Sequence, residues 1–97
     1  MPRQGYVEES ITGENQFTEA IGFDLEPGGF EISIGGTFVA TVVLQRKFEN
    51  KPTWRDVHEF TAASECIGEQ VDEETVWRIG VKTGGYVSGQ VDVRLSQ

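Results

Sequence analysis

The sequence predicts an all-β protein: an antiparallel β-sandwich of about seven strands, Ig-like or jelly-roll-like, with a flexible N-terminal arm. Apolar and polar residues alternate with a period of two over residues 38–48 and 76–95, as they do in half-buried strands. The chain contains twelve glycines and many Val, Thr and Phe residues, a composition typical of strands joined by turns. Apolar residues at helical spacing nowhere extend beyond one turn.

The expected elements follow from where the alternation stops. Residues 1–15 are polar and have no clear period, so we expect an arm there and a sandwich domain over residues 16–97. The turn signals are Glu26-Pro27-Gly28-Gly29, Gly35-Gly36, Asn50-Lys51-Pro52 and Gly84-Gly85. Between them we expect strands at residues 16–23, 29–34, 38–48, 54–60, 65–71, 76–83 and 87–95. A single domain of this length can build one core without metal or disulfides.

Three local hairpins are expected from side-chain pairing. Around Asn50-Lys51-Pro52, matching partners on one face predict the pairs Phe48–Trp54, Arg46–Asp56, Leu44–His58 and Val42–Phe60. Strands 54–60 and 65–71 are expected to pair next. Strands 76–83 and 87–95 are expected to pair with Trp77 opposite Val93, which requires a longer loop or a bulge near Ser88-Gly89. The expected core residues are Phe38, Val42, Leu44, Trp77, Ile79, Val91 and Val93.

The charge is acidic and unevenly distributed. Sixteen acidic and eight basic residues give a net charge of −8, which argues against a nucleic-acid partner. Acidic residues dominate residues 1–36 and the segment from Glu65 to Glu74, whereas the rest of the chain is slightly basic. This pattern serves solubility, or forms an acidic face for a basic partner surface. The candidate partner-interface residues are the arm's apolar Tyr6, Val7 and Ile11 and the acidic Asp72, Glu73 and Glu74.

Catalytic and cofactor signals are weak. His58 and Cys66 are the only candidates for a nucleophile–base dyad, and the expected pairing places them on opposite faces. Asp72-Glu73-Glu74 lacks the alternating oxygens and the glycine of a calcium loop. Trp54 and Trp77 are interpreted as core anchors, with sugar stacking as the alternative. We therefore expect no enzyme activity and no cofactor or metal. One cysteine, no apolar leader and no long apolar run predict folding inside a cell and no membrane contact.

Two segments carry a resemblance to a known group of proteins. The run TFVATVVLQRKFENKPTWRDV and the C-terminal VWRIGVKTGGYVSGQVDVRLSQ resemble small β-sandwich virion proteins of tailed bacteriophages. In that group a VTLQRS-type strand leads through a glycine-rich tip to TW, and a Y-x-SG-x-V-x-VRL strand closes the chain. Leu44-Gln45-Arg46, Thr53-Trp54 and the stretch from Tyr86 to Leu95 match this pattern. The tip at residues 49–52 departs from it.

The resemblance implies a capsid decoration (cement) protein on the virion surface, folded in the host cytoplasm before assembly. Its partner is then the major capsid protein, and it is expected to be a homo-oligomer, with a trimer favoured. One alternative is a tail- or head-fibre-associated adhesion module that contacts host glycans. Another, from a different class, is a free-standing binding module of a cellular organism. The number of copies per particle distinguishes a decoration protein from a tail- or head-fibre module. A glycan-binding screen distinguishes the cellular binding module.

Overall fold

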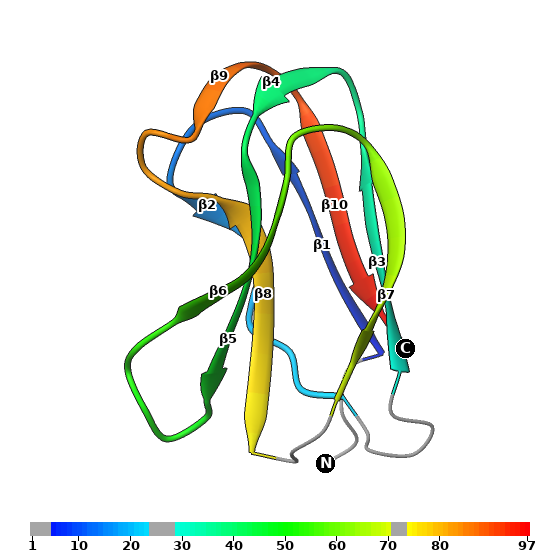
Figure 1. Ribbon diagram of the computed structural model, residues 1–97, viewed down its shortest axis with the longest axis vertical. Coiled ribbons are helices and arrows are strands. Elements are labelled where there is room, and N and C mark those ends of the chain that lie inside the picture. The colour runs from blue at the N-terminus through cyan, green and yellow to red at the C-terminus, as the bar shows by residue number, and fades with distance from the viewer. Residues whose placement is uncertain (1–4, 24–28, 71–73) are drawn as a thin grey trace.

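The computed structural model describes residues 5–23, 29–70 and 74–97, and all regular structure in these residues is β-strand. The three longest strands have seven residues each and the shortest has two (Figure 1). The strands are β1 (Tyr6–Ile11), β2 (Gln16–Phe17), β3 (Gly29–Gly35), β4 (Phe38–Ala40), β5 (Val42–Phe48), β6 (Arg55–Phe60), β7 (Ser64–Glu69), β8 (Thr75–Val81), β9 (Tyr86–Gly89) and β10 (Val91–Ser96).

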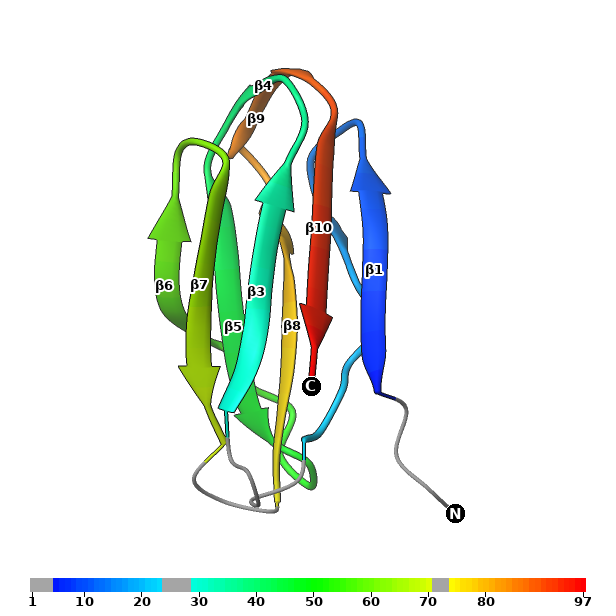
Figure 2. The same ribbon diagram turned by 90° about the vertical axis from the view of Figure 1, so that its right-hand side faces the viewer.

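The strands form two four-stranded antiparallel sheets and one short ribbon. The first sheet has the order β1-β10-β3-β7, and the second has the order β2-β8-β5-β6. Figure 2 shows these sheets as two layers, with the β4–β9 ribbon at one end. The predicted all-β antiparallel sandwich is confirmed.

The strand order is that of a jelly roll. Strands from the first half of the chain pair with strands from the second half: β1 with β10, β2 with β8, β3 with β7, and β5 with β6. Successive pairs alternate between the two sheets. The chain is therefore one long antiparallel hairpin wrapped into a sandwich, which is the arrangement of an eight-stranded jelly roll.

The core lies between the two sheets because each strand turns alternate side chains inward. Three aromatic rings form its centre: Phe23 stacks on Phe30 at 4.4 Å, and Phe30 lies 4.8 Å from Trp77. The Trp77 indole Nε1 donates a 2.6 Å hydrogen bond to Oε1 of the buried Gln70, so the polar end of the indole is satisfied. Six of the seven expected core residues are buried, and Phe38 is partly buried against the cluster.

The N-terminal region differs from the expected arm. Residues 6–11 form strand β1, which pairs along its whole length with β10. Val7 and Ile11 point inward and are fully covered, while Glu8 forms a 3.2 Å ion pair with Arg94. An edge strand with one face in water needs few apolar residues, which is why its polar composition resembled that of a tail. Residues 1–4 lie outside the described part of the chain.

Two of the expected local hairpins are wrong. β6 and β7 lie in different sheets, and so do β8 and β10. Trp77 and Val93 both enter the core, but from opposite sheets. Pairing of strands that are neighbours in the sequence would form cross-strand contacts equally well, but it would place the apolar faces of both strands in the same sheet. In the observed fold the two strands lie in opposite sheets, so their apolar faces pack against each other.

Two long expected strands are each divided in the structure. The segment 38–48 divides at Thr41 into β4 and β5, and the segment 87–95 divides at Gln90 into β9 and β10. Gly89 has a φ of 92°, and a side chain there would overlap the Thr37 carbonyl. The glycine thus permits the chain to leave the β4–β9 ribbon and enter the first sheet.

Candidate functional site

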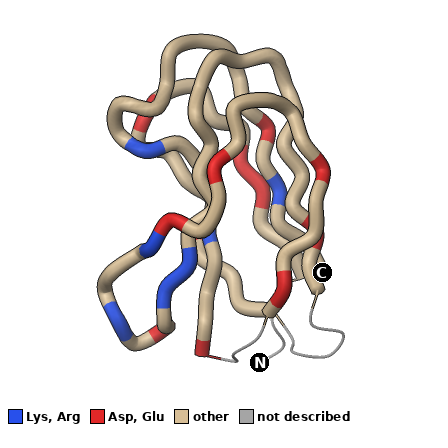
Figure 3. The backbone as a smooth tube through the Cα atoms, in the orientation of Figure 1, with Lys and Arg blue, Asp and Glu red and all other residues tan. Residues whose placement is uncertain are grey.

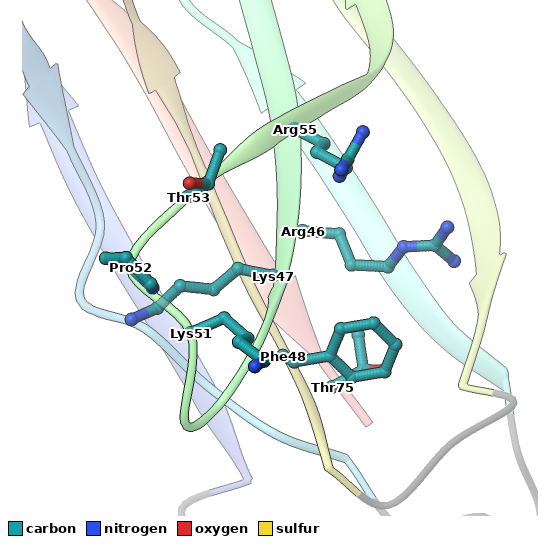
Figure 4. Close-up of a pocket in the computed structure, with 8 residues that line it drawn as sticks. All are labelled: Arg46, Lys47, Phe48, Lys51, Pro52, Thr53, Arg55 and Thr75. Atoms are coloured by element: carbon teal, nitrogen blue, oxygen red, sulfur yellow. The ribbon is translucent and has the colours of Figure 1, made fainter.

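Half of the basic residues gather at the end of the β5–β6 hairpin. Arg46, Lys47, Lys51 and Arg55 lie within ten residues that contain a single acid, Glu49. They border an open pocket of about 630 Å³. Figure 4 shows the lining side chains around the hairpin, which comprise the four cations together with Phe48, Pro52, Thr53 and Thr75. We call these eight residues the basic hairpin tip.

Backbone hydrogen bonds fix the turn at this tip. The Lys51 amide donates to the Phe48 carbonyl at 3.0 Å, which closes a tight turn before Pro52. The Glu49 amide donates to the Glu74 carbonyl at 2.6 Å, which ties the turn to the start of β8. One bond thus closes the turn, and the other attaches it to β8.

A β-bulge changes the expected register of the hairpin. The pairs Val42–Phe60 and Leu44–His58 are confirmed. Beyond Leu44 the register shifts by one residue, so Gln45 faces Asp56 and Arg46 faces Arg55. The expected pairs Arg46–Asp56 and Phe48–Trp54 are therefore wrong. The extra residue is Val57, which is left without a partner in the ladder and is 43% exposed.

The bulge has an electrostatic consequence, because it sets two arginines opposite each other. Like charges directly across a strand pair destabilise it. Among the described residues, none of the four tip cations forms an ion pair with a carboxylate. Arg46 instead lies over the Trp77 ring at 5.6 Å, and Lys47 lies over the Trp54 ring at 5.3 Å. The tip is therefore a concentrated positive surface that an anionic partner would stabilise.

A polar network braces the hairpin against β8. Arg78 lies between the rings of Phe17 and Trp54, with its guanidinium carbon 4.0 Å and 4.4 Å from the two ring centroids. Its Nε donates a 2.7 Å hydrogen bond to Oε1 of Gln45. Burial lowers the pKa of this guanidinium from its ordinary value, but Arg78 stays charged. The stacked arginine fixes Trp54 and, through it, the orientation of the tip.

The same network continues to a carboxylate. Gln45 Nε2 donates to Asp56 Oδ1 at 2.8 Å, and Lys82 Nζ donates to Asp56 Oδ2 at 2.7 Å. The hydrogen bond from Lys82, followed by that from Gln45, lowers the pKa of Asp56 below its ordinary value. The bond to Asp56 in turn raises the pKa of Lys82. Asp56 and Lys82 thus neutralise each other, and the positive charge that remains on the described part of this sheet belongs to the tip cations and the stacked Arg78.

The opposite side of the molecule is acidic. On the outward face of the first sheet, Ile67 is 70% exposed and pairs directly across from Glu31. Glu65 and Glu69 flank it on β7, pointing the same way because Cys66 and Gly68 between them face inward. Figure 3 shows acidic residues along this side and basic residues at the hairpin tip. We call Glu31, Glu65, Ile67 and Glu69 the acidic face.

A second acidic surface lies along the edge strand β1. Glu8 and Glu9 are exposed there, and Tyr6 is 43% exposed beneath the Arg94 guanidinium, 4.2 Å from the ring centroid. Within the described part of the chain, β1 has a hydrogen-bonded neighbouring strand on one side only. Its outer backbone groups therefore remain available to a partner. We call Tyr6, Glu8 and Glu9 the β1 edge.

Of the interface residues expected from the sequence, some are exposed in the structure and others are buried. Tyr6 is exposed, whereas Val7 and Ile11 are buried in the core and unavailable for a partner in this fold. Asp72 and Glu73 lie outside the described residues. Glu74 is exposed, and its carbonyl accepts the Glu49 amide. The basic hairpin tip was missed, although its signal is visible in the run RKFENKPTWR.

The expected dyad is not assembled. His58 is exposed on β6, Cys66 packs against the core on β7, and no hydrogen bond joins these two described side chains. Burial, followed by the nearby Glu65 carboxylate, raises the pKa of the Cys66 thiol. A raised pKa leaves less of the nucleophilic thiolate. Trp77 is 3% exposed and so cannot stack on a sugar.

Neither a metal site nor a membrane-spanning helix is found in the described residues. Residues 5–23, 29–70 and 74–97 contain no cluster of three or more His, Cys, Asp or Glu side chains arranged to hold a metal ion. A bilayer-spanning helix is likewise not found among the residues that the structure describes.

Comparison with known proteins found no match. No protein-family model matches the chain, and neither do curated proteins or solved structures.

Proposed function

We propose that the chain is a non-enzymatic virion structural protein of a tailed bacteriophage, and specifically a decoration (cement) protein. It binds the outer surface of the major capsid protein lattice as a homo-oligomer, with a trimer favoured, and stabilises the head. The observation that carries this proposal is the separation of charge on a compact jelly roll: acidic surfaces at the β1 edge and on the first sheet, and a basic hairpin tip across from them. Such surfaces favour assembly with charged partners.

The fold and the resemblance give independent support by analogy. Jelly rolls occur in viral capsid proteins and lectins, so the fold agrees with a virion protein without assigning the function. The residues that resemble phage virion proteins lie mainly on β5, β9 and β10. A shell binds many copies at once, so each contact need only be weak.

The β1 edge is the surface proposed to contact the capsid. It offers a strand edge with no neighbour among the described strands, the exposed Tyr6 ring, the carboxylate of Glu9 and that of Glu8, which is paired with Arg94. A basic capsid loop can add to such an edge through backbone hydrogen bonds and pair with its carboxylates. Contacts at the rim of an interface weaken as salt rises, so particle binding is expected to be salt-dependent.

Counting the chain in purified particles tests this proposal. Quantitative mass spectrometry is expected to give a copy number that matches the number of capsid subunits or of lattice axes. A few copies per particle would instead assign the chain to the tail or to a fibre. Its absence from particles would reject a virion role.

A second candidate, an adhesion module for host glycans, is favoured by one observation. Phe48 is 51% exposed among the cations of the hairpin tip, and an exposed aromatic beside positive charge suits an acidic sugar. A glycan array is the discriminating measurement. Specific binding that Phe48→Ser abolishes would favour this candidate over the decoration protein.

A further inference from the structure

The basic hairpin tip combines a positive rim with an apolar centre. Phe48 is 51% exposed, although its ring is large and apolar. Arg46 and Arg55 lie on the same side of the hairpin as the Phe48 ring, whereas Lys47 points to the other side, over Trp54 (Figure 4). None of the four tip cations has a carboxylate partner among the described residues. An apolar centre inside a charged rim is typical of a protein–protein interface. The ligand that suits it is a negatively charged surface with an apolar centre of its own.

The acidic face has this complementary form. Ile67 is as exposed as any large apolar side chain in the described residues, at 70%. Three carboxylates surround it: Glu31 across the strand pair, and Glu65 and Glu69 along β7. None of the three forms an ion pair with another described residue. The cations beside Phe48 therefore match the three carboxylates around Ile67, and neither group forms ion pairs among the described residues.

These two surfaces do not meet within one molecule. The hairpin tip belongs to the second sheet, whereas Ile67 points away from that sheet into solvent. Figures 2 and 3 show the two sheets as separate layers and the two charged regions on different sides of the sandwich. A contact between them therefore requires two molecules.

We infer that the partner of the basic hairpin tip is the acidic face of a second copy of this chain. Phe48 of one copy packs on Ile67 of the next, and the tip cations pair with the surrounding glutamates. The contact joins two different surfaces, so an open chain of copies has a free hairpin tip at one end and a free acidic face at the other. Such a head-to-tail interface closes into a ring or continues as a filament, according to the rotation between copies.

This inference deepens the proposed function: it rests on the proposed homo-oligomer and names the two surfaces that join its copies, and it does not involve the capsid contact. It also leaves the β1 edge free, so an assembled ring presents one such edge per copy to a lattice. Self-association and particle binding are therefore measured separately, and either can fail alone.

The test is the mass of the purified protein in solution, by analytical ultracentrifugation over a range of concentrations. The wild-type chain is expected to associate at about 0.1 M salt and to dissociate towards monomer at about 1 M, where the Debye length falls from about 10 Å to about 3 Å. Lys51→Glu with Arg55→Glu is expected to give monomers, and so is Glu65→Lys with Glu69→Lys. The chain carrying all four changes is expected to associate again.

Mixing the two charge-reversed proteins gives an additional test. Each supplies the surface that complements the other, so the mixture is expected to associate although each component alone is monomeric. Uncharged variants separate the apolar contribution: Phe48→Ser and Ile67→Ser are each expected to weaken association at least tenfold. Val87→Ser, which is equally exposed but lies outside both surfaces, is the matched control and is expected to associate normally.

Three results would overturn the inference. The first is a monomeric wild-type protein at every concentration tested. The second is association that neither charge reversal changes. The third is a monomer whose hairpin tip binds a sulfated oligosaccharide such as heparin, since the partner would then be a glycan. Glu8→Lys with Glu9→Lys distinguishes the two proposals, because this variant is expected to associate normally and to lose particle binding.

Discussion

The two sheets of this sandwich share one core but differ on their outward faces. In the first sheet the outward side chains are exposed or half-exposed and mainly polar, with five carboxylates and one arginine, and the strand pairs follow one another without a bulge. In the second sheet several outward side chains are themselves buried, among them Val43 and Gln45, beside the stacked Arg78. The first sheet is thus stabilised from one side, and the second from both. Surface for partners is consequently available on the first sheet and at the hairpin tip of the second.

The largest expected effect tests the shared core. Trp77→Ala removes the ring that contacts Phe30 and the partner of buried Gln70, so we expect it to cost about 3–5 kcal/mol of unfolding free energy. Denaturant unfolding measures this change. Val87→Ala at an exposed position is the control and is expected to stay within about 0.5 kcal/mol. A cost below about 1 kcal/mol for Trp77→Ala would contradict a single core.

The next effect compares two glycines of the first sheet. A methyl group at Gly68 would overlap the Phe30 ring, whereas one at Gly35 meets nothing within 4 Å. We expect Gly68→Ala to cost about 1–3 kcal/mol through overpacking, and Gly35→Ala to be close to neutral. Thermal unfolding of the two variants provides the measurement. Equal midpoints would mean that Phe30 repacks freely.

A third comparison addresses the outward faces directly. Val43 is 2% exposed on the second sheet, and Ile67 is 70% exposed on the first. At about 0.8 kcal/mol for each buried methylene, Val43→Ala is expected to cost about 1.5 kcal/mol. Ile67→Ala removes a larger group, yet it is expected to cost less than about 0.5 kcal/mol in the monomer. Chemical denaturation in high salt measures both unfolding free energies. A larger loss for Ile67→Ala than for Val43→Ala would contradict the difference between the sheets.

The smallest effect concerns acid stability. The pKa of Asp56 is lowered in the folded protein, so its contribution is present above the ordinary pKa near 3.8 and is lost as pH falls through the folded value. Asp56→Asn lacks this contribution, so its thermal midpoint is expected to fall less steeply below about pH 4 than that of the wild-type protein. Asp92→Asn is the matched variant, since the pKa of Asp92 is lowered by neutral Gln90 and Ser10. We expect a smaller change there, and an identical one would show that the Lys82 contact is unimportant.

The sequence predicted what depends on alternation and on local partners. The pairs Val42–Phe60 and Leu44–His58 followed from matching residues around one turn. The bulge after Leu44 was not predictable in this way, because Arg46–Asp56 is the better pair by charge. The observed register is favoured by the hydrogen bond from Gln45 to Asp56 and by the packing of Trp54 on Arg78, which no local pattern reveals. The pairing of β1 with β10 was missed because it joins the two ends of the described chain and no local signal marks it.

The candidate surfaces were only partly predictable for a similar reason. The net charge of the whole chain is −8, and this value does not reveal the four cations that lie close together at residues 46–55. The alternation of β7 predicts that Glu65, Ile67 and Glu69 share a face, but not which face lies in water. That assignment depends on the opposite sheet, which covers Cys66 and its neighbours.

The wrapped hairpin also constrains how the chain folds. Tyr6 pairs with Ser96 and Ile11 with Val91, so the first strand has no neighbour in its sheet until the last strand has been synthesised. Folds dominated by contacts between distant residues typically form in milliseconds to seconds, much more slowly than helical bundles. During this interval Val7 and Ile11 are exposed on a growing chain and available to other chains. The acidic residues between them, Glu8 and Glu9, repel such encounters and so protect the nascent strand before it is enclosed.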